Sequence, residues 1–220
     1  IVKNIVSIGM SPFAMNTCAC VVVIFINMGL SHYGGDLAVG AYGIASKVSF
    51  IFVMVTIGLN QGMLPIAGYN YGAQRYDRLM RVLKLAMITA TIITTTGFLI
   101  AEIIPYQCAR LFTSDATLIG MAIEGIRIHM LAFPIVGCQM VITNFFQCIG
   151  KAKISIFLSL SRQMLFLIPL LIILPPIMEL DGVWTAMPVS DAVASIVAFV
   201  MMAKYMKKFK RNIAENGIQQ

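Results

Sequence analysis

Charged residues are scarce in this chain. Asp, Glu, Lys and Arg make up 11% of its 220 residues, whereas an average soluble domain carries roughly 25%. Hydrophobic residues make up 59%, and the mean hydropathy is +0.88. A bundle of this size cannot hide so much apolar surface from water, so lipid must cover part of it. The composition predicts an all-α polytopic membrane bundle.

Several chemical signatures are also missing. The five cysteines form no C-x-x-C pair and no Cys/His cluster, so neither a zinc site nor a disulfide framework is predicted. We find no nucleotide-binding loop, no H-E-x-x-H motif and no Ser/His/Asp set. We therefore expect no enzyme, no metal and no cofactor. The chain starts at Ile1 without a signal peptide, and we expect it to be a fragment.

Six apolar segments fill the chain. Each is long enough for a helix that crosses a bilayer, which needs about 20 residues, and short turns with Gly or Pro separate them. Gly34, Gly35 and Asp36 follow the first segment. We expect a transmembrane bundle over residues 1–205 and a basic cytoplasmic tail over 206–220. The predicted spans are 5–31, 37–68, 80–104, 116–147, 153–176 and 183–205.

The net charge of +7 reflects topology rather than nucleic-acid binding. Arg110 is the one basic residue in the turns on one side of the predicted bundle. Twelve basic residues lie on the other side, which places that side and both ends in the cytoplasm of a plasma-membrane protein. These twelve are Lys3, Arg75, Arg78, Arg81, Lys84, Lys151, Lys153, Lys204, Lys207, Lys208, Lys210 and Arg211.

The second span ends in the run GLNQGMLPIAGYNYGAQRYDRL, from Gly58 to Leu79. Two glycine pairs, each four residues apart, predict a smooth strip against which another helix packs closely. A proline between the pairs predicts an interruption of the helix. The residues of this structural motif are Gly58, Gly62, Pro65, Gly68, Asn70 and Gly72.

This run resembles the multidrug and toxic compound extrusion (MATE) transporters. The resemblance rests on Gly58, Gln61 and Gly62, on Pro65, and on the block from Gly68 to Ala73 with Arg75 and Arg78. Further similar segments are AYGIASKV at 41–48, ARLFTSD at 109–115, FQCIGKAK at 146–153 and GVWTAMPVSD at 182–191. The resemblance covers nearly the whole chain.

The resemblance implies a function and a missing partner. Such transporters have twelve helices in two six-helix lobes, and this chain is similar to the carboxy-terminal lobe. It implies an antiporter that exports cationic or amphipathic organic compounds by alternating access, with a proton or sodium as coupling ion. Some members carry an acidic residue in their seventh helix. Here that helix, 11–30, has Asn16 but no carboxylate, so no sodium site is expected in this lobe.

Ionisable and amide groups inside the spans are the candidate contacts for substrate or coupling ion, because such groups are costly in a membrane. Glu124 and Arg127 are three residues apart and able to pair. Lys47 and Asp191 have opposite charges at similar expected depth, so the four either form one charge cluster in the outer half, or Lys47 and Asp191 act separately, one in substrate binding and one in packing. The candidates are Lys47, Asp191, Arg127, Glu124, Asn16, Gln61 and His129.

Two other functions fit the same segments. One is a flippase or polysaccharide exporter of related architecture that moves lipid-linked sugars. The other is an accessory or structural membrane subunit without transport of its own. The expected partners are the lipid bilayer, a small-molecule substrate and the amino-terminal lobe, with no nucleic acid.

Overall fold

The computed structural model describes the backbone of residues 2–217 and the side chains of residues 17–151 and 153–207. All regular structure in these residues is helical, which confirms the predicted fold class. The elements are α1 (Val2–Gly72), α2 (Tyr76–Ile103), α3 (Pro105–Arg110), α4 (Ala116–Met130), α5 (Phe133–Cys148), α6 (Ala152–Leu160), the π-helix η1 (Ser161–Leu167), α7 (Ile168–Ile173) and α8 (Pro175–Gly217).

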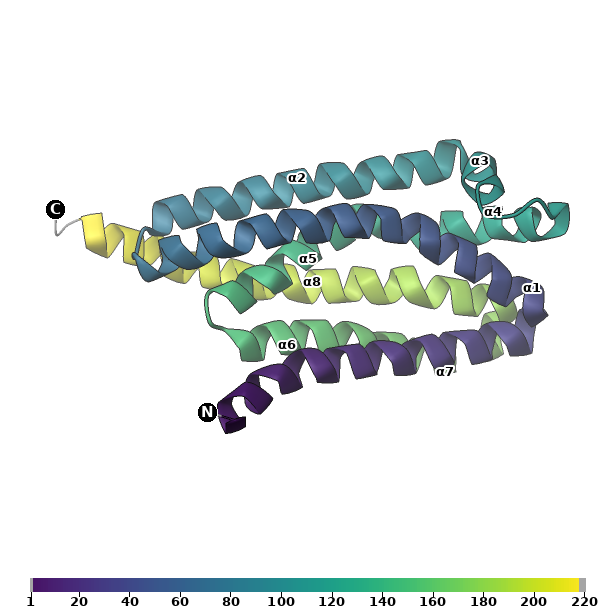
Figure 1. Ribbon diagram of the computed structural model, residues 1–220, viewed down its shortest axis with the longest axis horizontal. Helices are drawn as coiled ribbons and strands as arrows, with labels where there is room; N and C mark the ends of the chain where they lie inside the picture. The colour runs from purple at the N-terminus through teal and green to yellow at the C-terminus, as the bar shows by residue number, and fades with distance from the viewer. Residues whose placement is uncertain (1, 218–220) are drawn as a thin grey trace.

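Helix α1 consists of two arms that meet at Gly35. The backbone of Gly35 has φ 65° and ψ −166°, a conformation that glycine adopts without the steric cost of a side chain. Figure 1 shows the chain reversing there, so that the second arm runs back along the bundle. We call this the Gly35 end of the bundle. Both termini and the α1–α2 turn lie at the opposite end, which we call the Gly72 end (Figure 1).

Four helices are individually long and apolar enough to cross a membrane, and the bent pair of α4 and α5 makes a fifth span. Counting the two arms of α1 separately gives the six predicted passes. The sixth begins at Pro175, is broken at Glu179 (φ 51°, ψ −127°) and continues as helix to Gly217. The expected tail at 206–220 therefore prolongs the last helix through residue 217.

The prolines inside the spans occupy different positions. Pro134 and Pro169 stand at the starts of α5 and α7. The interruption predicted at Pro65 is wrong, because α1 keeps helical backbone angles there. A transmembrane helix can carry proline without a break where neighbouring groups satisfy the freed carbonyl.

Helix α4 begins at a capping carboxylate outside the apolar spans. Asp115 accepts hydrogen bonds from the amide of Thr117 at 2.9 Å and from its hydroxyl at 2.6 Å. The side-chain and backbone bonds from Thr117 hold the pKa of Asp115 below its ordinary value of 3.8. The ARLFTSD segment thus ends in a helix cap.

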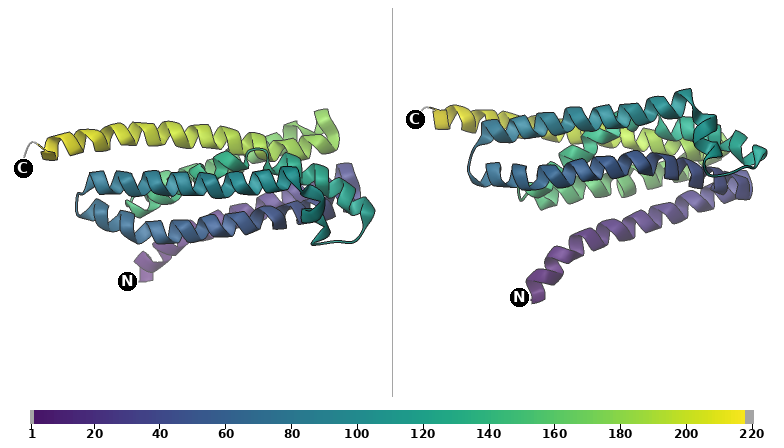
Figure 2. Two further views of the ribbon diagram at one scale, coloured as in Figure 1. Left: turned by 90° about the horizontal axis from the view of Figure 1, so that it is seen from above. Right: turned by 45° about the horizontal axis from the view of Figure 1, so that its top comes forward.

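The apolar side chains form two separate cores, one at each end of the bundle. The Gly35-end core joins α1, α3, α4 and α8 and includes Leu30, Ala41, Ile126 and Trp184. The Gly72-end core joins α2, α5, α8 and the end of α1, and includes residues such as Phe145. The rotated views in Figure 2 show the long helices α1, α2 and α8 running along the length of the bundle. The layer between the cores holds the candidate site.

Candidate functional site

A layer of buried polar side chains separates the two cores. Most of the buried polar residues that the structure describes fall in this polar layer, and they come from the second arm of α1 and from every span that follows it. They are Ser49, Thr56, Asn60, Thr94, Gln139, Ser161, Ser190 and Ser195. Most of the hydroxyls donate to a carbonyl of their own helix, whereas Ser190 donates to the Arg162 carbonyl of the fifth span.

The backbone is irregular at the same level. Helices α4 and α5 meet at a bend of 50°, and the fifth span changes to the π-helix η1 over Ser161–Leu167. Pro188 lies inside α8 next to these elements. Such departures persist at membrane depth only where protein or a water-filled cavity satisfies the freed backbone groups, and π-helical turns are frequent at functional sites.

An ion pair lies within the polar layer. The Arg162 Nε is 3.2 Å from Asp191 Oδ1, and the side chains are 35% and 24% exposed. The hydroxyl of Ser190 donates to the Arg162 carbonyl at 2.9 Å, and that of Ser195 donates to the Asp191 carbonyl at 2.7 Å. The side-chain oxygen of Gln139 accepts a second, longer contact from Ser195 at 3.5 Å. The π-helix and α8 therefore hold opposite charges together between the two cores.

His129 lies on the Gly35 side of this layer. Its Nε2 is 3.1 Å from the hydroxyl of Ser49, and its Nδ1 is 3.2 Å from the sulfur of Met187. The ring of Tyr42 stands edge-on to the imidazole, with centroids 6.1 Å apart. The imidazole is thus held by three elements, α1, α4 and α8.

A polar cavity of about 190 Å³ opens beside the ion pair. Arg162 forms part of its wall, and the side-chain oxygen of Gln163, another wall residue, has no hydrogen-bond partner among the described residues. The remaining lining residues are Gln139, Met140, Thr143, Asn144, Gln147, Ser155 and Ser159. Since one water occupies ~30 Å³ in the liquid, the cavity has room for several waters. It is smaller than the ~300–1,000 Å³ of pockets for drug-sized compounds.

The predicted charge cluster of Lys47, Asp191, Glu124 and Arg127 is wrong. The ammonium of Lys47 instead lies over the ring of Phe112, 5.8 Å from its centroid. Its long stem lets the charge reach the end of the bundle, away from Asp191. No pattern in the sequence indicates that the π-helix places another cation beside Asp191.

The predicted pair of Glu124 and Arg127 is also wrong. Arg127 lies 3.7 Å from the carboxylate of Glu102, at the end of α2, and both side chains are about half exposed. Glu124 lines a separate cavity of about 260 Å³ together with Asp181 and Trp184. Two residues three apart on a helix can pair, but an acidic residue on a neighbouring helix competes for the same arginine.

The glycine strip of the motif does not pack within the described residues. A Cβ added at Gly58, Gly62 or Gly72 would meet no atom within 4 Å, and at Gly68 it would make an ordinary contact with a carbonyl of Cys148. Gln61 is exposed on the same face. The predicted close approach is therefore wrong inside this bundle, and the face is open.

The amides of the motif differ in their surroundings. The side-chain amide of Asn70 donates to the Ile66 carbonyl at 2.8 Å, and the backbone carbonyl of Asn70 accepts from the Arg75 amide at 2.9 Å at the turn into α2. Asn60 is buried, and neither of its side-chain atoms has a partner among the described residues. Asn16 lies outside the residues whose side chains the structure describes.

Sequence reasoning missed two of the glycines that do allow close packing, Gly97 and Gly137. A Cβ at Gly97 would lie 2.7 Å from the Phe52 ring, and one at Gly137 would lie 2.6 Å from the hydroxyl of Thr94. Neither belongs to a glycine pair, so spacing could not identify them. Sequence reasoning also did not include Arg162 among the candidate contacts for substrate or coupling ion.

A bundle of apolar spans with an ion pair, amides and a polar cavity at mid-depth has the features of a polytopic membrane transporter. The profile of the MatE family matches residues 12–173. The chain belongs to this family, which confirms the resemblance drawn from the sequence. Its members are multidrug transporters rather than enzymes.

The sequences of curated relatives align with nearly the whole of this chain. The multidrug export protein MepA of Staphylococcus saprophyticus is 22% identical over 202 residues, which cover 92% of this chain and 44% of that protein. MepA from a Staphylococcus aureus strain is 23% identical over 200 residues, covering 91% of this chain and 44% of its own. The chain thus spans about half the length of the curated relatives it matches.

Solved structures share the fold. The MATE multidrug transporter DinF-BH, solved with a bound ligand, is 35% identical with a TM-score of 0.80, over 93% of this chain and 46% of that one. A MATE structure in complex with MaL6 is 20% identical with a TM-score of 0.87, over 96% of this chain and 48% of that one. The matched part is again about half of each solved chain.

Proposed function

We propose that this chain is one lobe of a secondary antiporter that exports cationic or amphipathic organic compounds by alternating access. A proton or sodium gradient across the plasma membrane drives the export, and both ends of the chain face the cytoplasm. Membership of the MatE family supports the transport class. The names of the relatives support multidrug export.

The open face of the second α1 arm supports a second lobe as partner. Gly58, Gln61, Gly62, Pro65 and Tyr69 are all exposed on one side of this arm. A transmembrane helix with small residues along an amide-bearing face favours another helix over lipid. Since the chain covers less than half of its relatives, the partner is a related lobe, and a drug-sized site forms between the two.

The ion pair in the polar layer carries the proposal for coupling. While Asp191 is ionised, Arg162 has a partner at 3.2 Å. A coupling ion that binds the Asp191 carboxylate competes with Arg162 and leaves the arginine without this partner inside the membrane. The bundle then gains free energy by a movement that brings Arg162 to water or to another acceptor in the adjacent cavity. Binding of a coupling ion is thereby linked to a change of conformation.

The test is export from proteoliposomes that contain the full polypeptide. Efflux of a fluorescent organic cation is measured under a pH gradient and, separately, under a sodium gradient. We expect Asp191→Asn and Arg162→Gln to abolish gradient-driven efflux, whereas Asp36→Asn, at the exposed turn of α1, exports normally. Normal gradient-driven export by both polar-layer variants would contradict the coupling role.

The same liposomes distinguish the other functions. Movement of a lipid-linked sugar without export of organic cations would identify a flippase or polysaccharide exporter. Export of neither class by the complete protein, at normal insertion, would identify an accessory subunit. The family match favours the multidrug exporter over both.

A further inference from the structure

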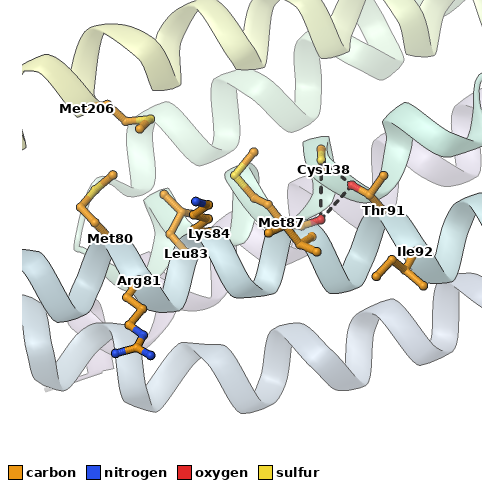
Figure 3. Close-up of a pocket in the computed structure, with 10 residues that line it drawn as sticks. Met80, Arg81, Leu83, Lys84, Met87, Thr91, Ile92, Cys138 and Met206 are labelled. Atoms are coloured by element: carbon orange, nitrogen blue, oxygen red, sulfur yellow. Dashed lines mark hydrogen bonds between the residues drawn. The ribbon is translucent and has the colours of Figure 1, made fainter.

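A second, larger cavity lies on the outside of the bundle and differs in composition from the cavity beside the ion pair. It is a groove of about 750 Å³ between α2 and α8, with α5 at its floor (Figure 3). Most of its lining is apolar and adaptable in shape, because methionine adjusts to irregular ligands. The lining residues are Met80, Arg81, Leu83, Lys84, Met87, Ile88, Thr91, Ile92, Cys138 and Met206.

The groove has charge at one end and none at the other. Arg81 and Lys84 are the two charged residues among those that line it, and both are basic and exposed. In Figure 3 the Lys84 ammonium lies beside Leu83 and Met87, whereas the Arg81 guanidinium points away from Met206. Lys84 is therefore the cation best placed to contact a ligand in the groove.

The polar atoms deeper in the groove are already occupied. Thr91 donates to the Met87 carbonyl at 2.8 Å, and its hydroxyl lies 2.9 Å from the sulfur of Cys138. Both contacts are drawn in Figure 3. These two lining side chains already have partners, so this part of the site favours hydrocarbon.

The distances along α2 match a lipid that lies parallel to the helices. Lys84 is eight residues from the start of α2 at Tyr76, about 12 Å at ~1.5 Å per residue, and its flexible stem covers part of that distance toward the membrane interface. Ile92 lies the same distance further into the bilayer. A headgroup at Lys84 therefore leaves an acyl chain running along Ile88 and Ile92.

We propose that this groove binds a phospholipid with an anionic headgroup from the leaflet at the Gly72 end. The ammonium of Lys84 contacts the phosphate, Arg81 adds charge beside it, and one acyl chain fills the apolar part. Basic pockets between helices at this level suit anionic headgroups. A cationic export substrate would be repelled by both charges. A second copy of the chain would also be repelled, because its Lys204 and Lys207 on α8 are exposed and basic as well.

The test is native mass spectrometry of the full polypeptide, extracted in mild detergent and titrated with phosphatidylglycerol or with phosphatidylcholine of the same acyl chains. Each basic group near a membrane surface contributes about fivefold in affinity for anionic lipid. We expect wild type to prefer phosphatidylglycerol and Lys84→Gln to lower that affinity about fivefold. Arg81→Gln has a smaller effect because its guanidinium points away.

Two further variants complete the experiment. Lys153→Gln makes the same charge change at the start of α6, outside the groove, and is expected to bind like wild type. Ile88→Trp changes a half-exposed wall residue (48% exposed), so it leaves the core intact while narrowing the groove. It is expected to lower binding of both lipids.

An equal loss of phosphatidylglycerol affinity in Lys84→Gln and Lys153→Gln would overturn the proposal, since the loss would then follow from the change in net charge and not from the groove. Equal affinity of wild type for the two lipids would also overturn it, as would unchanged binding in Ile88→Trp. Lipid binding is measured without transport. Failure of the export assay therefore leaves this result standing, and the reverse holds as well.

Discussion

Gly137 is the position where a single methyl group should reveal the packing of this bundle. It lies on α5 against α2, and an added Cβ would come within 2.6 Å of the Thr94 hydroxyl and 2.8 Å of the Ala90 carbonyl. The carbonyl is part of a helix and cannot rotate away. The two helices must therefore move apart in Gly137→Ala. The matched change, Gly62→Ala, adds the same methyl group where no atom lies within 4 Å.

The two substitutions should change stability in opposite directions. Overpacking costs about 1–3 kcal/mol, and the rigid carbonyl places Gly137→Ala near the upper end. Alanine favours a helix over glycine by ~1 kcal/mol, which leaves a net loss of about 2 kcal/mol. At Gly62 only the helical preference acts, so the free energy of unfolding should stay level or rise by up to ~1 kcal/mol.

Thermal denaturation in detergent, at one scan rate, measures the difference. For a chain of this size, 1 kcal/mol corresponds to roughly 2–4 °C, so we expect the Tm of Gly137→Ala to fall by about 4–8 °C. A Tm for Gly137→Ala at or above that of wild type would refute the reasoning about the α2–α5 contact. Gly62→Leu should keep its Tm in this lobe yet lose export, if the open face meets a second lobe.

Three other outcomes follow from the structure. Lys47→Ala should export normally, since its ammonium lies over Phe112 and not in the polar layer, and a lost gradient response in the same efflux assay would contradict this. Because the pKa of Asp115 is depressed in the folded chain, its cap stabilises α4 fully above pH 3.8, and this stabilisation is lost as the pH falls through the lower folded pKa. Amide hydrogen exchange in the first turn of α4 should rise over that acidic range. An unchanged exchange profile would argue against the cap. When Arg78 and Asp36 are each replaced by cysteine, an impermeant reagent should label intact cells only at position 36, and the reverse pattern would invert the topology.

Composition and turn chemistry were enough to predict the fold class and the number of passes. Apolar segments of sufficient length, separated by glycine and proline, must form transmembrane helices in a bilayer, because there the backbone N–H and C=O groups find hydrogen-bond partners only within the protein. The turn at Gly35 could be located because a sharp reversal requires a residue free of Cβ clashes. The π-helix and the bend between α4 and α5 could not, because both depend on contacts between spans.

Sequence reasoning named Asp191 and His129 as candidates but not Arg162, the partner of Asp191 in the structure. Burial cost alone identifies Asp191 and His129 as unusual. To predict whether Lys47 or Arg162 pairs with Asp191, one must know the rotation and the depth of the three helices that carry these residues. A π-helical turn changes both the rotation and the depth of the side chains on its helix. The same limit explains the glycine motif, whose spacing indicates a smooth face without indicating whether this chain or another covers it.

The division of the interior into two cores has a consequence for how the bundle opens. Apolar contacts are cooperative within each core, and the polar layer between them joins the two through hydrogen bonds and an ion pair. Each end should then unfold locally as its own unit. Native-state hydrogen exchange should give two classes of protected amides, one around Ile126 and one around Phe145, with different opening free energies. Detergent or lipid that loosens one end should leave the protection factors at the other unchanged.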